Sequence, residues 1–115
     1  MKAEYQTILD NMPTRSAWAR GVKDYAADLL QDLDENEPTR ANLLNGASDW
    51  REWAMGGCGL CYDDNIAERL CSPSELKRNR NGSLPPNSRD ETWIDVETRA
   101  VSQAAARILR AVKAA

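Results

Sequence analysis

The three cysteines are the side chains whose spacing points most directly to chemistry. Cys58 and Cys61 form a Cys-x-x-Cys pair, and Cys71 follows ten residues later. Such pairs occur in zinc sites and in redox centres of the thioredoxin type. The chain offers three thiols and no histidine for a tetrahedral zinc site, and Asp63 could complete the set. We predict no metal and no cofactor, and interpret the cysteines as thiols in a crowded glycine-rich loop. A redox or disulfide switch is the alternative.

Histidine is absent from the sequence, which narrows the catalytic options. Without it there is no His-based triad and no side chain that ordinarily acts as a base at neutral pH. The sequence also lacks a recognisable pairing of a nucleophile with a base. We therefore predict that the protein is not an enzyme.

A second motif resembles a helix-turn-helix. The segment Ile66-Ala-Glu-Arg-Leu70 has the pattern of its first helix, and Ser72 begins the second. In such motifs the second helix reads the major groove of DNA, where Arg78, Asn79 and Arg80 would suit phosphates or base edges. The turn is about one residue shorter than usual and lacks glycine. Two short helices that pack on longer ones are therefore the alternative interpretation.

A basic stretch is the predicted binding surface for an anionic partner. It comprises Lys77, Arg78, Arg80 and Arg89. No acidic residue lies between Glu75 and Asp90. Such a set can bind nucleic-acid phosphates or an acidic protein surface, although charges in loops are often only solvated.

Two tryptophans give an alternative binding face. Trp50 and Trp53 share a face if they lie on a helix, and Gly56 and Gly57 beside them could leave that face open to a ligand. The competing interpretation is that both tryptophans anchor the core.

Hydrophobic periodicity predicts two long helices that form the frame. Apolar residues at intervals of three and four predict a helix over about 15–33, capped by Thr14 or Ser16. Gly21 within it marks a close helix contact. A second stripe predicts a helix over about 89–113, opened by a Ser88-Arg-Asp-Glu91 capping box. The members of that stripe are Trp93, Ile94, Val101, Ala104, Ala105, Ile108, Leu109 and Val112.

Shorter helices are expected between and before the two long ones. They lie at 3–12, at 39–44, around Trp50 and Trp53, from Asp63 or Asp64 to Leu70, and at 73–79. A Ser72-Pro73-Ser74-Glu75 capping box opens the last of these. Residues 56–59 are expected to form a glycine-rich loop, and 60–62 an extended segment.

Length and composition are those of one compact all-α domain over residues 1–115. Phenylalanine is absent and β-branched aliphatic residues are few, which argues against a β-sandwich. No apolar run is long enough for a membrane span, and the N-terminus does not resemble a signal peptide. We therefore expect a cytoplasmic protein that does not bind membranes.

Charge is divided unevenly along the chain. Residues 1–64 contain six basic and twelve acidic residues, a net of −6, whereas residues 65–115 contain nine and six, a net of +3. A bipolar molecule of this kind can bind a polar partner or pair with itself head to tail. The basic excess is too small to predict strong nonspecific DNA binding.

Four segments resemble a family of small, functionally uncharacterised bacterial proteins of conjugative elements and prophages of gut bacteria. They are Thr14-Arg-Ser-Ala-Trp18, Leu43-Leu-Asn-Gly-Ala-Ser-Asp-Trp50, Gly56-Gly-Cys58 and Ile66-Ala-Glu-Arg-Leu-Cys-Ser-Pro-Ser-Glu-Leu-Lys-Arg78. The resemblance implies an accessory role in a mobile element and brings no activity or catalytic residue. We therefore expect a non-catalytic accessory or regulatory protein that binds a protein or a nucleic acid. The alternatives are a helix-turn-helix DNA-binding regulator and an inhibitor of a host defence nuclease of the anti-CRISPR type.

Overall fold

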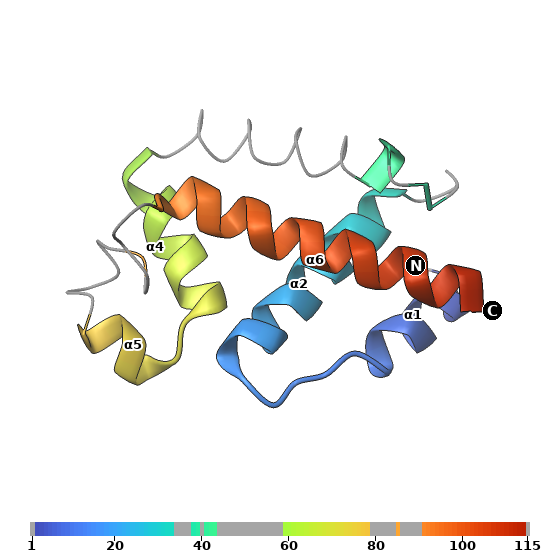
Figure 1. Ribbon diagram of the computed structural model, residues 1–115, viewed down its shortest axis with the longest axis horizontal. Helices are drawn as coiled ribbons and strands as arrows, with labels where there is room; N and C mark the ends of the chain where they lie inside the picture. The colour runs from blue at the N-terminus through green and yellow to red at the C-terminus, as the bar shows by residue number, and fades with distance from the viewer. Residues whose placement is uncertain are drawn as a thin grey trace.

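The computed structural model describes residues 2–33, 38–39, 41–43, 59–78, 85 and 91–114, without the side chains of 32, 59–64, 78 and 114. Every regular element in these ranges is helical, which confirms the all-α prediction (Figure 1). The elements are α1 (Ala3–Asp10), α2 (Ala17–Leu33), α4 (Gly59–Leu70), α5 (Pro73–Arg78) and α6 (Trp93–Ala114). None of the helices in the described ranges has the length and apolarity that a membrane crossing requires.

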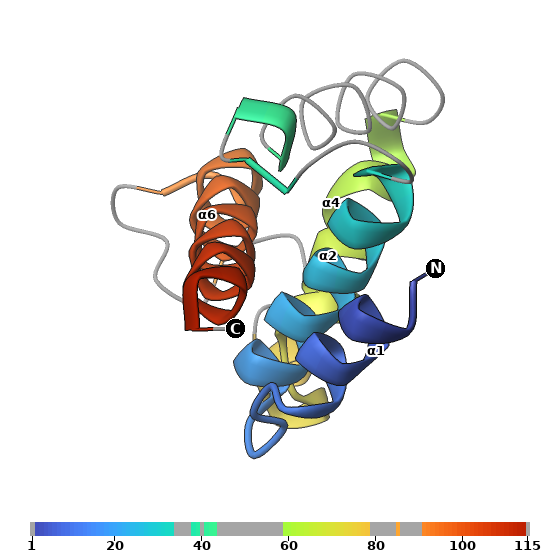
Figure 2. The same ribbon diagram turned by 90° about the vertical axis from the view of Figure 1, so that its right-hand side faces the viewer.

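The frame of the molecule is the pair of long helices, as the periodicity predicts. α2 crosses α6, and α4 packs against both of them, while α1 packs against α2 (Figures 1 and 2). Two hydrogen bonds fix how the long helices meet: Trp18 pairs with Gln103, and Tyr25 pairs with Glu97. Residues far apart in the sequence therefore share one interface.

The core lies between these helices, and the buried side chains of α2 recur at the predicted intervals of three and four. The buried apolar side chains of α2 are those of Val22, Tyr25, Ala26, Leu29, Leu30 and Leu33. The stripe of α6 differs from the predicted one, because Ile94 and Val112 are exposed whereas Val96 and Ala100 are buried. Ile94 is the second residue of α6 and Val112 the third from its end, so both lie at the ends of the stripe.

Helix caps that depend on neighbouring residues alone are present as predicted. The Oγ of Ser16 accepts a hydrogen bond from the backbone N–H of Ala19 at 3.0 Å and caps α2. At α5, the Oγ of Ser72 accepts from the N–H of Glu75, and the Glu75 carboxylate accepts from the N–H of Ser72 at 3.1 Å. These reciprocal bonds form the predicted capping box.

The predicted start of α6 near residue 89 is wrong, because the helix begins at Trp93. Thr92 caps it: its Oγ1 accepts from the N–H of Asp95, whose carboxylate accepts from the N–H of Thr92 at 3.0 Å. The hydrogen bonds that the Asp95 carboxylate accepts from the backbone N–H and the hydroxyl of Thr92 lower its pKa. Glu91, which was expected to close the earlier capping box, instead accepts from Arg99 at 3.1 Å. Ser88 lies outside the described residues.

The predicted start of α4 is also wrong. The helix begins at Gly59, so residues 60–62 are helical and not extended. The spacing of Tyr62, Ile66 and Leu70 continues the helical pattern one turn earlier than the aspartates suggested. A glycine costs less at the first helical position than inside a helix, because fewer intrahelical hydrogen bonds depend on it there.

Candidate functional site

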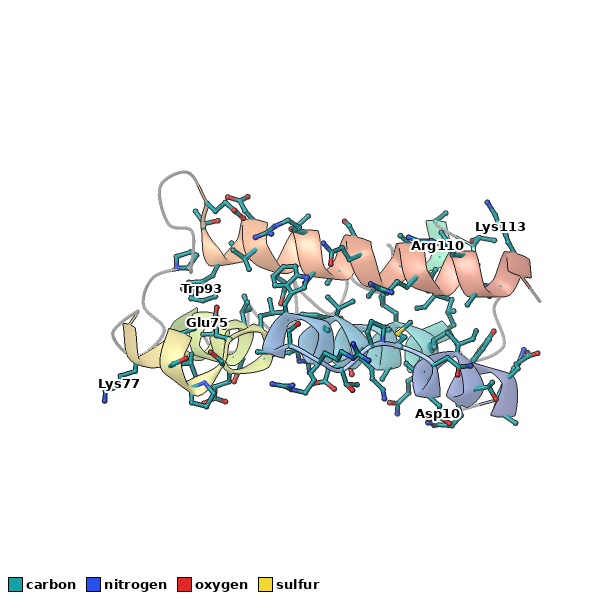
Figure 3. All side chains as sticks on the ribbon, turned by 60° about the horizontal axis from the view of Figure 1, so that its bottom comes forward. Asp10, Glu75, Lys77, Trp93, Arg110 and Lys113 are labelled. Atoms are coloured by element: carbon teal, nitrogen blue, oxygen red, sulfur yellow. The ribbon has the colours of Figure 1, made fainter. Side chains whose placement is uncertain are left out.

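The predicted basic surface is described only in part. Lys77 is exposed on α5, and Arg78 is the last residue of that helix. Figure 3 shows that α5 lies at one end of the molecule and that the side chain of Lys77 points outward from this end. Arg80 and Arg89 lie outside the described residues, so the structure neither assembles this set nor separates it.

The alternative binding face, formed by the two tryptophans, lies wholly outside the residues that the structure describes. Trp50 and Trp53, together with Gly56 and Gly57, belong to the ranges whose structure is not described. Whether they form a face therefore stays a prediction.

Both the connection and the second helix depart from the helix-turn-helix that the sequence resembles. Only Cys71 and Ser72 separate α4 from α5. α5 has six residues, so its length is about 9 Å, less than two turns. Glu75 and Leu76 of this helix are half-buried, while Lys77 is exposed. A short helix of this kind presents little surface to a DNA groove.

Cys71 is buried and has the properties of an inert thiol. Its exposed fraction is 6%, and burial raises the pKa of the thiol to about 11, with the charge of Glu75 adding to the rise. The thiolate is the form that binds metals and attacks electrophiles, so Cys71 is a poor ligand and nucleophile at neutral pH. Among the described residues, no group of three or more metal-ligating side chains occurs. Cys58 lies outside the description, as does the side chain of Cys61.

A surface cleft that sequence reasoning missed lies between α2 and α6. We call it the α2–α6 cleft, and its volume is about 40 Å³. It is lined by Met12, Pro13, Trp18, Ala19, Val22, Lys23, Gln103 and Arg107. Binding pockets for small molecules usually measure roughly 300–1,000 Å³. The cleft is therefore suited to one inserted group rather than to a whole cofactor.

Trp18 forms a fixed wall of the α2–α6 cleft. Its indole Nε1 donates a hydrogen bond to Oε1 of Gln103 at 2.7 Å. The guanidinium of Arg99 lies over the ring, 4.7 Å from its centroid, and also donates to Glu91. Such a cation–π contact stabilises the pair by about 0.5–1 kcal/mol at exposed sites. The wall is thus held in place before any ligand arrives.

Two cations flank the cleft, one from each helix. Lys23 of α2 is half-buried and Arg107 of α6 is exposed, and neither has a salt bridge or hydrogen bond within the described part of the chain. Residues 98–115 contain four basic residues and no acidic one. In Figure 3, Arg110 and Lys113 lie on the C-terminal part of α6. A helix dipole stabilises cations in the last turn of the helix. Arg107 lies about two turns before the end of α6, so the dipole does not explain a cation at this position.

A buried polar cluster holds the helices on either side of this cleft in register. The Tyr25 hydroxyl donates to Oε2 of Glu97 at 2.9 Å, and Glu97 is fully buried. Arg69 of α4 lies 4.6 Å from the Tyr25 ring centroid and donates to Asp28 at 2.6 Å. The cluster therefore ties α2, α4 and α6 together at one point. None of these residues lines the cleft, which indicates that the cluster positions the helices rather than binding a ligand.

Gly21 sets how closely α2 and α4 approach, as its position in the sequence predicts. A Cβ built on Gly21 would lie 2.5 Å from the backbone oxygen of Arg69 and 2.6 Å from Cδ2 of Leu70. Cβ atoms essentially never come so close to other atoms, so only glycine fits here without a shift of the helices. In the sequence of α2, Gly21 lies among the residues that line the cleft, between Ala19 and Val22.

Comparison with protein-family models, with curated proteins and with solved structures found no match, so the function is inferred from the residues and their geometry alone.

Proposed function

We propose that the protein is a non-catalytic binding protein that captures an anionic macromolecular partner at the α2–α6 cleft. The observation that carries this proposal is the pairing of a preformed apolar wall with two cations that have no counterion among the described residues. The mobile-element resemblance gives the setting, an accessory or regulatory role.

The charges support binding because neither cation has a counterion among the described residues and one of them, Lys23, is half-buried. Lys23 is half-buried beside Trp18 and Val22, in a cleft whose lining contains no carboxylate. A charge beside apolar surface interacts more strongly with an incoming anion than the same charge in open water does. An anionic partner would neutralise Lys23 and Arg107 and cover the apolar floor in one step.

The chemistry of the lining supports capture rather than catalysis. Its polar side chains are two cations and the amide of Gln103, which is already engaged by Trp18. Cations and amides hold anions, whereas hydrolysis or group transfer requires a nucleophile with a base beside it.

A second candidate function is DNA binding by α4 and α5 as a helix-turn-helix regulator. The observation in its favour is that a capped helix with Lys77 exposed follows α4 directly. An inhibitor of a host defence nuclease would be one form of the first proposal, since such an inhibitor also acts by occupying a macromolecular surface.

An unbiased selection tests the proposal. Immobilised protein is panned against a random-peptide library and, separately, against random-sequence duplex DNA. The enriched pools are then bound to the wild type, to Lys23→Glu/Arg107→Glu and to Arg78→Glu/Arg80→Glu. The two double variants change the net charge equally, so each is the electrostatic control for the other.

We expect an enriched pool whose binding is lost in Lys23→Glu/Arg107→Glu and kept in Arg78→Glu/Arg80→Glu. The reverse pattern, with duplex DNA as the enriched pool, would assign binding to the helix-turn-helix candidate and reject the cleft. Absence of any enrichment above a heat-denatured sample would reject both candidates.

A further inference from the structure

We infer that the partner of the α2–α6 cleft is a short acidic protein segment that inserts one apolar side chain between Lys23 and Arg107. This inference rests on the proposed function and specifies the chemistry of its partner. In the complex, the apolar side chain fills the cleft, and carboxylates on either side of it pair with the two cations.

The floor of the cleft is mostly apolar, which favours binding of an apolar group. Met12, Pro13, Ala19 and Val22 contribute four of the eight lining residues, and the Trp18 ring forms one wall. A volume of about 40 Å³ admits the end of one apolar side chain and no larger ligand. Apolar surface of this kind is favourably removed from water, and a single side chain removes it without a larger ligand.

The two cations, Lys23 and Arg107, favour a ligand that has carboxylates on both sides of that apolar group. Lys23 comes from α2 and Arg107 from α6, and the Trp18–Gln103 hydrogen bond joins the two helices within the cleft itself. The spacing of the cations is therefore fixed by helix packing. An arginine guanidinium pairs with a carboxylate through two parallel hydrogen bonds, and a lysine ammonium acts as a point charge.

The same features disfavour a nucleic acid. Proteins that bind single strands stack bases on open aromatic rings, but Arg99 covers one face of Trp18 and Gln103 engages its N–H. The chain has a net charge of −3, and residues 1–64 carry −6 of the formal charge. A long polyanion experiences this field over its whole length, whereas a short acidic segment meets only the local cations.

Four fluorescent probes of equal length test the inference by anisotropy at low and at physiological salt. The first is a peptide with one central leucine between glutamates, and the second replaces that leucine with glycine. The third keeps the leucine and replaces the glutamates with glutamines. The fourth is a DNA oligonucleotide, measured as a single strand and as a duplex.

We expect the first peptide to bind most tightly, and we expect loss of the leucine or of the glutamates to weaken binding by about tenfold or more. Added salt should weaken the first peptide and leave the third unchanged. The inference is overturned if the DNA probes bind more tightly than the peptides, or if the glycine peptide binds as well as the leucine peptide.

Two single variants separate the apolar and the charged parts of the site. Ala19→Leu fills the cleft and keeps both cations, so it should weaken the leucine peptide about tenfold and leave the glycine peptide unchanged. Arg107→Glu should weaken both acidic peptides. Lys77→Glu makes the same charge change on α5, outside the cleft, and should weaken neither.

A direct measurement keeps the test valid if Ala19→Leu disturbs the fold. In the wild type, the leucine peptide should shift the indole N–H resonance of Trp18, assigned with Trp18→Phe, more than the other indole resonances. An unshifted Trp18 signal with a bound peptide would reject the cleft as its site. A different result would reject this inference and leave the proposed function standing. In that case the selected peptide or DNA pools lose binding in Lys23→Glu/Arg107→Glu, but none of the acidic peptides binds the wild type.

Discussion

Replacing Gly21 with alanine should destabilise the protein, although glycine-to-alanine changes inside helices normally stabilise them. The added Cβ would lie 2.5 Å from the backbone oxygen of Arg69, where ordinary van der Waals contact begins at 3.4 Å. The difference, about 0.9 Å, is the distance by which α2 and α4 must separate at this point. The obstructing atom belongs to the backbone, so no rotation of a side chain relieves the contact.

Two opposing terms set the size of the effect. Alanine gains about 1 kcal/mol of helix propensity over glycine, while overpacking a filled interface costs about 1–3 kcal/mol. The upper part of that range applies, because separation of the helices also stretches the 2.6 Å ion pair between Arg69 and Asp28. We therefore expect a net loss of about 1–2 kcal/mol in the free energy of unfolding, or a lowering of Tm by roughly 4–8 °C.

Urea denaturation followed by far-UV circular dichroism measures this loss. The matched control is Ala106→Gly, at an exposed position inside α6, which should lose about 1 kcal/mol and so calibrate the propensity term in this chain. If the control behaves in this way and Gly21→Ala is as stable as the wild type or more stable, the close approach of α2 and α4 at Gly21 is refuted.

Tyr25→Phe removes a hydroxyl that donates to the buried Glu97, so it should lower the free energy of unfolding by about 1–3 kcal/mol in urea titrations; an unchanged value would contradict the role of this hydrogen bond. Thr92→Ala removes the cap of α6 and should cost about 0.5–2 kcal/mol. Because Thr92 lowers the pKa of Asp95 in the folded state, this carboxylate contributes stability above its ordinary pKa of 3.8, and the contribution is lost as the pH falls through the lowered value. The difference between wild type and Thr92→Ala should therefore shrink in acid, and a constant difference would argue against the pair. Cys71, with a pKa of about 11, should react with iodoacetamide far more slowly in the folded protein near neutral pH than in urea, as peptide mass mapping would show; equal rates would contradict its burial. Elemental analysis should find no stoichiometric zinc or iron, and about one metal per chain would instead make the thiols ligands.

Local chemistry determines the parts of the fold that could be predicted. The cap at Ser16 and the capping box at Ser72 involve residues three positions apart, so the sequence contains all that they need. The start of α6 was misplaced because two such patterns follow each other, one at Ser88 and one at Thr92, and both have suitable donors and acceptors. Local sequence cannot decide between them, since the choice depends on where Trp93 is buried.

The remaining errors concern contacts between distant residues. Glu97 interrupts the apolar stripe of α6 in the sequence, and its burial becomes intelligible only with Tyr25, 72 residues away, as a hydrogen-bond donor. The α2–α6 cleft combines residues 12–23 with Gln103 and Arg107, and no local motif marks it. The predicted site at Lys77 followed a run of basic residues, whereas the cations of the cleft are isolated in the sequence.

The crossing of α2 and α6 also has a consequence for how the protein is made. During translation, α2 leaves the ribosome long before α6, because 72 residues separate Tyr25 from its partner Glu97. At roughly 5–20 residues per second, this interval lasts about 4–14 s. In that time α1 and then α4 can cover part of the apolar stripe of α2. The part that packs against α6 stays uncovered until α6 has been synthesised. A nascent-chain pulse-labelling experiment should therefore find the α2 stripe protected only after α6 has emerged, and slow translation between residues 34 and 92 should increase aggregation of the unfinished chain.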